Sequence, residues 1–265
     1  MHPLLDPSLR LVVGHRGNAV AAPENTLESF RQAIALGVDA IELDVRITSD
    51  GEVVVMHDAM VDRTTDGTGA VAALTLEAFR RLDAGARFTR DGGRTFPYRG
   101  RGIAPPTFAD VLEQLPADQP ILIEIKTAAA SKRLREVIEA HGAESRCIVE
   151  SFDPAAAEVF RGSRIAIGAS QRDAVRLLVP ALLGRAPRSL PYRFLAIPRR
   201  YRGLSVPIAA IVRATEPAGV LVHVWTVNDP SVAIDLWKVG VRAVISDDPA
   251  TILRAREGAG GRTRA

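Results

Sequence analysis

The stretch Leu11-Val12-Val13-Gly14-His15-Arg16-Gly17 sets the pattern for the rest of this chain, because an apolar run ends there in a polar triplet. The apolar part predicts a buried strand, and the polar part predicts that the carboxyl end of this strand is exposed. The same arrangement recurs in Ile41–Val45, Val53–Asp58 and Ile121–Lys126. Strands that begin apolar and end in ionisable groups are how an α/β barrel builds an active site at one end.

Eight apolar runs alternate with helix-like segments along almost the whole chain. We expect parallel strands at Arg10–Gly14, Asp39–Val45, Pro120–Ile125, Cys147–Ser151, Arg164–Ala169, Phe194–Pro198, Val220–Thr226 and Arg242–Ser246. The helices expected between them include Glu24–Leu36, Ser131–His141, Pro154–Arg161, Pro207–Pro217 and Pro230–Val239. Prolines begin several of these helices, as is common in a first helical turn. Eight β units joined by helices predict an α/β fold with a closed parallel barrel, in one domain over residues 1–265.

A ninth apolar run, Glu52–His57, does not fit this alternation. Only a short turn that contains Ser49-Asp50-Gly51 separates it from the second strand, whereas a parallel crossover needs a dozen or more residues. We therefore expect this run to fold back as a hairpin-like arm that carries His57 to the barrel mouth. The glycine-rich, polar residues 58–106 then form an insertion after the second strand, with one helix at Thr75–Leu82.

Composition excludes several classes of protein. The chain has 265 residues, a net charge of only +3 and no block of like charges, so we expect no nucleic-acid partner. Its single cysteine, Cys147, excludes an internal disulfide and is expected to be a buried thiol. No run approaches the ~20 apolar residues of a membrane span, and Met1–Arg10 lacks the apolar core of a signal segment. We expect a cytoplasmic protein without stable membrane insertion; the sequence does not indicate its oligomeric state.

Three carboxylates are expected at the same mouth. Glu42 and Asp44 are two residues apart on a strand, so both side chains point to the same face. Glu124 stands near the carboxyl end of the next parallel strand. Buried acids are costly without a partner, and oxygen ligands suit one hard divalent cation, Mg²⁺ or Ca²⁺. The alternative is that one acid faces the core and pairs with an arginine.

The charge balance of this cluster favours an anionic substrate. Three carboxylates and one divalent cation leave about −1, and Arg16 and Lys126 bring the site to about +1. A site that holds a cation and is also basic suits a phosphate ester. For each of these two basic residues, a structural salt bridge is the alternative interpretation.

Two histidines end separate strands beside the acids. His15 and His57 could supply the acid and the base for cleavage of a P–O bond, although His57 could instead be a metal ligand. His223 lies inside a strand and is expected to be packed. Trp225 ends the seventh strand, where a platform for the substrate and a plug for the barrel are equally consistent with its position.

An ordered set of motifs covers nearly the whole chain and resembles the glycerophosphodiester phosphodiesterase family. These motifs are His15-Arg16-Gly17, Pro23-Glu24-Asn25-Thr26, Glu42-Leu43-Asp44-Val45, Thr48-Ser49-Asp50-Gly51, His57-Asp58, Glu124-Ile125-Lys126, Ser151-Phe152-Asp153-Pro154, Trp225-Thr226-Val227-Asn228 and Ser246-Asp247-Asp248-Pro249. The resemblance implies a TIM-type (β/α)8 barrel that hydrolyses glycerophosphodiesters to glycerol 3-phosphate and an alcohol. It also implies that the two histidines are the acid/base pair, that the three carboxylates bind the metal and that Arg16 contacts phosphate.

Two other functions stay open beside this one. A lysophospholipase D would keep the fold and act on lipid diesters, and a non-catalytic barrel would only bind a metabolite. The paired histidines disfavour the second, because a binding protein does not need both. The attacking group is either water or the glycerol 2-hydroxyl.

The segment Val175–Tyr192 bears on the choice of substrate. It is apolar with scattered arginines, so it is either an amphipathic element at a membrane surface or an ordinary barrel helix with its loop. We favour the barrel helix, because Pro180 and Gly184 interrupt the segment. A lipid-active enzyme would show an apolar patch at its mouth. The sequence therefore predicts water-soluble glycerophosphodiesters as substrates, with loose selectivity for the alcohol.

Overall fold

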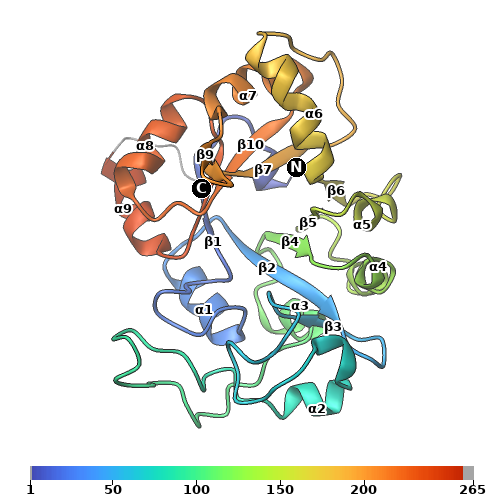
Figure 1. Cartoon of the computed structure of the whole chain (residues 1–265), viewed down its shortest axis with the longest axis vertical. Coiled ribbons are helices and arrows are strands. Elements are labelled where there is room, and N and C mark those ends of the chain that lie inside the picture. The colour runs from blue at the N-terminus through green and yellow to red at the C-terminus, as the bar shows by residue number, and fades with distance from the viewer. Residues whose placement is uncertain (1, 259–265) are drawn as a thin grey trace.

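The structure, a computed structural model, describes residues 2–258 and contains a nearly closed barrel of eight parallel strands (Figure 1). In barrel order the strands are β1 (Leu11–Gly14), β2 (Ala40–Ile47), β4 (Ile121–Ile125), β5 (Cys147–Glu150), β6 (Ala166–Ile167), β7 (Phe194–Pro198), β10 (Leu221–Trp225) and β11 (Ala243–Ser246). A parallel bridge between Gly168 and Phe194 joins the two ends of the sheet. The predicted (β/α)8 barrel is confirmed.

A helix follows each barrel strand. These helices are α1 (Leu27–Ala35), α3 (Phe108–Gln114), α4 (Ser131–Ala140), α5 (Pro154–Glu158), α6 (Gln171–Leu182), α7 (Ile208–Thr215), α8 (Pro230–Lys238) and α9 (Pro249–Gly258). Short 3₁₀ turns are η1 (Pro3–Leu5), η2 (Val71–Ala73), η3 (Ala128–Ala130) and η4 (Glu216–Ala218). Within residues 2–258, no helix is both long enough and apolar enough to cross a membrane.

Several element ends differ from the prediction. The first helix begins at Leu27 and not at Glu24, because Asn25 is left-handed (φ 58°) and the Thr26 hydroxyl accepts the Ser29 N–H as an N-cap. The strand expected over Arg164–Ala169 is reduced to the two residues of β6. Propensity does not locate such ends well, whereas capping side chains do.

The insertion after the second strand folds as expected. Strand β3 (Val53–Val55) pairs antiparallel with β2, with Val45 opposite Val55, and helix α2 (Leu76–Arg80) follows. A small core that includes Met56, Val61 and Phe79 holds the insertion together. The hairpin-like arm is thus confirmed, and because β3 runs back along β2 it brings His57 to the level of Asp44 at the barrel mouth. Figure 1 shows the insertion in cyan and green beside β2 and α3.

The barrel interior is layered, since alternate strand residues point inward. Its lower layers are apolar, and η1 packs against them through the buried Leu4. The ring of His223 is fully buried, stacks on Phe194 at 5.1 Å between centroids, and places Nε2 3.0 Å from the Leu4 carbonyl oxygen. His223 is therefore packed, as expected. Cys147 is a free buried thiol, and burial raises its pKa to about 12.

Candidate active site

The inward positions at the carboxyl ends of the strands carry the ionisable residues. They surround a cavity of about 150 Å³, which is lined by His15, Arg16, Glu42, His57, Glu124, Lys126, Glu150, Phe152, Trp225, Thr226 and Ile245. Asp44 stands opposite Glu124 on the neighbouring strand and is fully buried beside this cavity. The structure therefore brings together all eight residues that the sequence singled out.

The three carboxylates form one compact cluster. Glu42, Asp44 and Glu124 can each present an oxygen atom such that the three atoms lie within 4.8 Å of one another. The Nζ atom of Lys126 lies 2.8 Å from Asp44 Oδ1 and 2.7 Å from Glu124 Oε1. Asn25 donates from Nδ2 to Asp44 Oδ2 at 2.7 Å. The Asn25 side chain thus fixes the orientation of one of the three acids.

The electrostatics of this cluster suit a cation. Burial, with the nearby charges of Asp44 and Glu124, raises the pKa of Glu42 well above its usual value. Burial works against ionisation of Asp44, but Lys126 and Arg16 outweigh it and lower the pKa of this acid. Three acids with mutual repulsion and an all-oxygen donor set fit a hard divalent ion. A cation bound among them would remove the repulsion that disfavours the charged form of Glu42.

A tight turn after β1 places Arg16. Its backbone is left-handed (φ 54°), and its N–H donates to Glu42 Oε2 at 3.0 Å. Gly17 follows with φ 91°, and a Cβ at that position would collide with Ser29, so the turn requires glycine. The Arg16 guanidinium pairs with Glu24 (2.7 Å) and Asp44 (3.2 Å). Arg16 thus makes structural salt bridges and also lines the cavity, where it can contact a phosphate.

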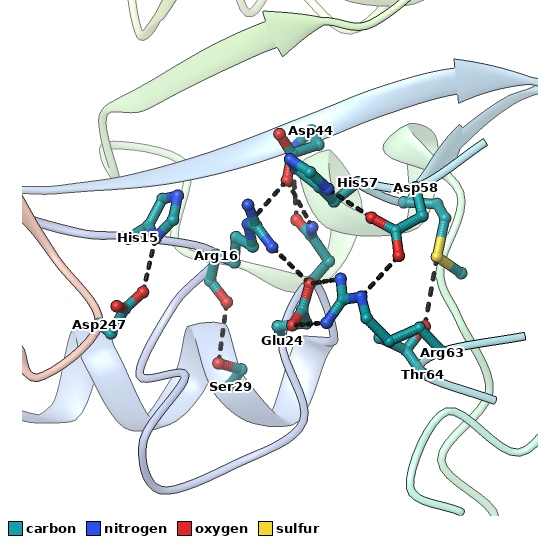
Figure 2. Close-up of polar contacts among 12 residues, drawn as sticks. His15, Arg16, Glu24, Ser29, Asp44, His57, Asp58, Arg63, Thr64 and Asp247 are labelled. Carbon is teal, nitrogen blue, oxygen red and sulfur yellow. Dashed lines mark hydrogen bonds and ion pairs between the residues drawn. The ribbon is translucent and has the colours of Figure 1, made fainter. Parts of the chain in front are cut away.

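His15 is held by a carboxylate from the opposite end of the chain. Its Nδ1 lies 2.6 Å from Asp247 Oδ1 (Figure 2). Its Nε2 lies 4.0 Å from Glu42 Oε2. Asn228 donates from Nδ2 to Asp247 Oδ2 at 2.8 Å and accepts the Asp247 N–H at 2.9 Å. The ring of His15 is therefore oriented by two further side chains.

His57 is held in the same manner from the insertion. Its Nδ1 lies 2.6 Å from Asp58 Oδ1, and Asp58 Oδ2 accepts from Arg63 Nε. Arg63 then donates through both terminal nitrogens to Glu24 at 2.7 Å, as Figure 2 shows. The hydrogen bond from Arg63 is the main reason that the pKa of Asp58 is lowered to about 2. His57 is thus tied to the carboxylate that also holds Arg16.

Several residues that complete the site had no role assigned from the sequence. Asp247, Asn228, Asp58 and Glu24 lie in the quoted motifs and orient the groups named above. Glu150 lies beside Glu124 on the next strand, and burial, together with the charge of Glu124, raises its pKa to about 8. The signal for Glu150 was present, since it occupies the same position at the end of β5 that Glu124 occupies in β4.

A second and larger cavity opens beside the first. Its volume is about 410 Å³, and it shares Glu124, Glu150, Phe152 and Trp225 with the smaller one. The rings of Phe152 and Trp225 are nearly perpendicular, with 6.1 Å between centroids, so Trp225 forms part of a wall between the two spaces. It is neither a buried plug nor remote from the site.

The prediction that Pro180 interrupts an apolar segment is wrong, because α6 continues through this proline. Val175, Val179, Leu182 and Leu183 are 61–63% exposed on α6 and its C-cap. The choice of an ordinary barrel helix is confirmed by its position between β6 and β7. The mouth nevertheless carries an apolar surface, so the argument for water-soluble substrates loses its premise.

Comparison with known proteins adds independent findings. Residues 15–251 match the model of the glycerophosphoryl diester phosphodiesterase family. A glycerophosphodiester phosphodiesterase of Caldanaerobacter subterraneus is 35% identical over 253 residues, which cover 92% of this chain and 96% of that protein.

Solved structures show the same similarity. The glycerophosphoryl diester phosphodiesterase domain of a Mycobacterium tuberculosis protein has a TM-score of 0.83 at 23% identity, covering 94% of this chain and 99% of that one, and supports the fold. A phosphodiesterase of Oleispira antarctica, solved in complex with the product sn-glycerol-3-phosphate, has a TM-score of 0.71 at 28% identity. That alignment covers 94% of this chain and 97% of the Oleispira chain.

Proposed function

This chain belongs to the glycerophosphoryl diester phosphodiesterase family and is a glycerophosphodiester phosphodiesterase, and from that premise we propose how its residues carry out the reaction. The substrate is a diester of glycerol 3-phosphate, and the products are glycerol 3-phosphate and an alcohol. The roles proposed for each side chain rest on the distances and charges of the site.

Glu42, Asp44 and Glu124 would hold one divalent cation, Mg²⁺ or Ca²⁺. When bound, this ion supplies positive charge to a nonbridging oxygen of the phosphate. Arg16 and Lys126 add positive charge at the same cavity, so the diester anion meets a site that attracts it. Trp225 contacts the substrate from the opposite wall.

The two histidines move protons. One removes the proton of the attacking hydroxyl, whether that of water or of the glycerol 2-position, and the other protonates the alcohol oxygen as the P–O bond breaks. The observation that carries this proposal is that an aspartate holds each of the two histidine rings in the same way. Each Nδ1 lies 2.6 Å from a carboxylate oxygen, and within residues 2–258 neither Nε2 atom makes a hydrogen bond, so both are available for proton transfer.

Removal of the metal tests the proposal. We expect purified protein that has been dialysed against EDTA to release no glycerol 3-phosphate from glycerophosphocholine, and to melt at a lower temperature. Addition of Mg²⁺ or Ca²⁺ should restore both properties, and the more effective ion identifies the cofactor. Full turnover in excess EDTA would reject the cation site. Cytoplasmic location stays a prediction from the sequence, which cell fractionation tests.

A further inference from the structure

Helix α6 presents large apolar side chains to the solvent, where a barrel helix normally presents polar ones. Four such residues of α6 and its C-cap are 61–63% exposed: Val175, Val179, Leu182 and Leu183. They lie three or four residues apart, so they share the outward side of the helix. The opposite side, with the buried residues Leu177 and Ala181, packs on the barrel. The exposed apolar side chains of α6 are therefore not needed for the barrel fold.

A short hairpin extends the apolar surface of α6. It consists of β8 (Arg200–Tyr201) and β9 (Leu204–Ser205), which pair antiparallel after β7. Tyr201 and Leu204 are exposed, and both line the larger cavity together with residues of α6. The Tyr201 hydroxyl accepts a hydrogen bond from Gln171 Nε2 at 2.6 Å, which ties the hairpin to the start of α6. These two residues and the four of α6 are called the α6–hairpin surface below.

Exposed apolar residues are concentrated at the α6–hairpin surface. Within residues 2–258, eleven large apolar side chains are exposed, and six of them belong to this surface. Of the others, Phe152 belongs to the wall of the site, and four lie elsewhere at loops or helix ends: Val20, Leu36, Met60 and Val239. Single exposed apolar residues are normal, whereas a contiguous group of them marks an interaction site. Figure 1 shows α6 on the side of the barrel away from the insertion.

The chain around the α6–hairpin surface is strongly basic. Between Ala174 and Thr215 there are eight arginines and no aspartate, glutamate or lysine. This stretch therefore carries a charge of +8, whereas the whole chain carries only +3, so that the rest of the chain has a net charge of −5. The positive charge of the protein is thus collected around one surface, which directs anionic partners to it.

These arginines are not neutralised by acids of the protein. Among residues 2–258, none of the eight forms an ion pair, whereas exposed arginines elsewhere, such as Arg133, Arg135 and Arg161, pair with a glutamate three or four residues away. Arg176 on α6 and Arg185 just after it are exposed beside the apolar residues. An apolar surface with a border of unpaired arginines is complementary to a partner that is both anionic and apolar.

We propose that the α6–hairpin surface binds the surface of a lipid bilayer that contains anionic lipids. The apolar side chains enter the boundary between head groups and acyl chains, and the arginines contact the phosphates around them. Such binding is peripheral, because α6 stays packed on the barrel through Leu177 and Ala181. A second copy of the chain is a poorer occupant, since two surfaces of the same charge repel each other.

Binding of this kind would orient the whole molecule. The hairpin follows the carboxyl end of β7, and Tyr201 and Leu204 line the larger cavity, so the α6–hairpin surface adjoins the open end of the barrel. A docked molecule has this end beside the bilayer. Docking needs no turnover and is therefore independent of the proposed function.

Cosedimentation with vesicles tests the proposal on the metal-loaded protein, after free metal has been removed. We expect at least about tenfold stronger binding to vesicles of equal parts phosphatidylcholine and phosphatidylglycerol than to vesicles of phosphatidylcholine alone. High salt should weaken this binding, because it screens the arginines. Excess glycerol 3-phosphate should not displace the protein from the vesicles, because this product occupies the active site and leaves the α6–hairpin surface open.

Two double variants separate the apolar and the charged contributions. Val179→Gln/Leu183→Gln changes exposed apolar residues that do not line the larger cavity, and Arg176→Gln/Arg185→Gln removes two unpaired charges. Each double variant should bind anionic vesicles roughly tenfold more weakly than the parent protein. Hydrolysis of glycerophosphocholine in solution should stay unchanged in both, which shows that they are folded.

Matched controls carry the same substitutions at other places. Leu36→Gln/Val239→Gln changes two exposed apolar residues at the ends of α1 and α8. Arg94→Gln/Arg101→Gln removes two exposed charges from the insertion. Both controls should bind anionic vesicles as the parent protein does.

Several outcomes would overturn the assignment of this surface. They are equal binding to neutral and anionic vesicles, displacement by glycerol 3-phosphate, and undiminished binding in either double variant of the surface. A dimer that light scattering detects in the parent protein and not in Val179→Gln/Leu183→Gln would also overturn it, since the occupant would then be a second copy. None of these outcomes affects the proposed function, which fails only if glycerophosphocholine is not hydrolysed with metal present.

Discussion

At the scale of single residues, the two histidine rings are each held by a carboxylate, but the histidines come from different elements. His15 ends a barrel strand and is held by Asp247 from beyond the last strand. His57 lies after the hairpin strand β3 and is held by its own neighbour, Asp58. If each histidine moves one proton, neither can replace the other.

Removal of either imidazole should therefore stop most turnover. We expect His15→Ala and His57→Ala each to lower kcat roughly 10²–10⁴-fold, with the far-ultraviolet circular dichroism spectrum unchanged. Metal content of the purified variants distinguishes the two possible roles of His57. A His57→Ala protein that has lost its metal would identify this residue as a ligand and contradict its assignment to proton transfer.

Asp247, whose carboxylate contacts His15 Nδ1, offers a variant that keeps the imidazole in place. Asp247→Asn can present an amide N–H to Nδ1 and so favour the wrong tautomer of the ring. We expect kcat to fall about 10²-fold with little change in KM or metal content, since Asp247 touches neither the cluster nor the substrate. The matched control is Asp248→Asn, because Asp248 caps the last helix through Thr251 and asparagine caps equally well. Equal losses in the two variants would show a general structural effect.

At the scale of elements, the insertion joins the barrel through Arg63. This residue spans Asp58 and Glu24, and its hydrogen bond keeps the pKa of Asp58 low, at about 2. In Arg63→Gln the pKa of Asp58 should rise toward its normal value, so that Asp58 is protonated at a higher pH and releases His57.

The pH profile of kcat measures this change. We expect its acidic limb to move to higher pH in Arg63→Gln, with metal content unaffected. Arg80→Gln serves as the control, because Arg80 is equally exposed within the insertion but pairs with Asp110, away from the site. An unchanged acidic limb in Arg63→Gln would mean that Arg63 only fastens the insertion.

The elements also show what sequence alone can predict. Alternation of strands and helices was sufficient for the barrel, and the short turn at Ser49-Asp50-Gly51 was sufficient for the antiparallel arm. The short length of β6 and the continuation of α6 beyond Pro180 were not predictable, because tertiary packing overrides local propensity there. Residues at strand ends were predicted well, whereas Arg63 and Asn228 lie in loops whose path depends on the whole fold.

At the scale of the whole molecule, the barrel has a closed end and an open end. Segment η1 lies across the closed end, where the buried ring of His223 contacts the Leu4 carbonyl. Burial lowers the pKa of His223 to about 4, against a normal value of 6.5. The unfolded chain therefore takes up a proton at a higher pH than the folded protein. The stability that this neutral ring contributes is complete above about pH 6.5 and is lost as the pH falls toward 4.

The unfolding free energy measured as a function of pH tests this contribution of His223. The loss of unfolding free energy between pH 7 and 4 that is due to His223 should be on the order of 3 kcal/mol. We expect His223→Gln to be less stable than the parent protein at pH 7 but to lose less on acidification, as measured by urea unfolding. His141→Gln, a change at a partly exposed helix end, should leave the pH dependence as it was. Parallel pH curves for parent and His223→Gln would exclude this histidine as the source.

The wall formed by Phe152 and Trp225 separates the two cavities at the open end of the barrel. The proposed chemistry lies on the side of β1, β2, β4 and the insertion, while α6 and the hairpin of β8 (Arg200–Tyr201) and β9 (Leu204–Ser205) surround the larger cavity. Because the two cavities share only Glu124, Glu150, Phe152 and Trp225 among their lining residues, the hairpin and α6 can be exchanged in protein engineering without replacing the other residues of the site. A library that varies only these two elements would sample new preferences for the leaving alcohol on an unaltered reaction centre, so selectivity can diversify without loss of catalysis.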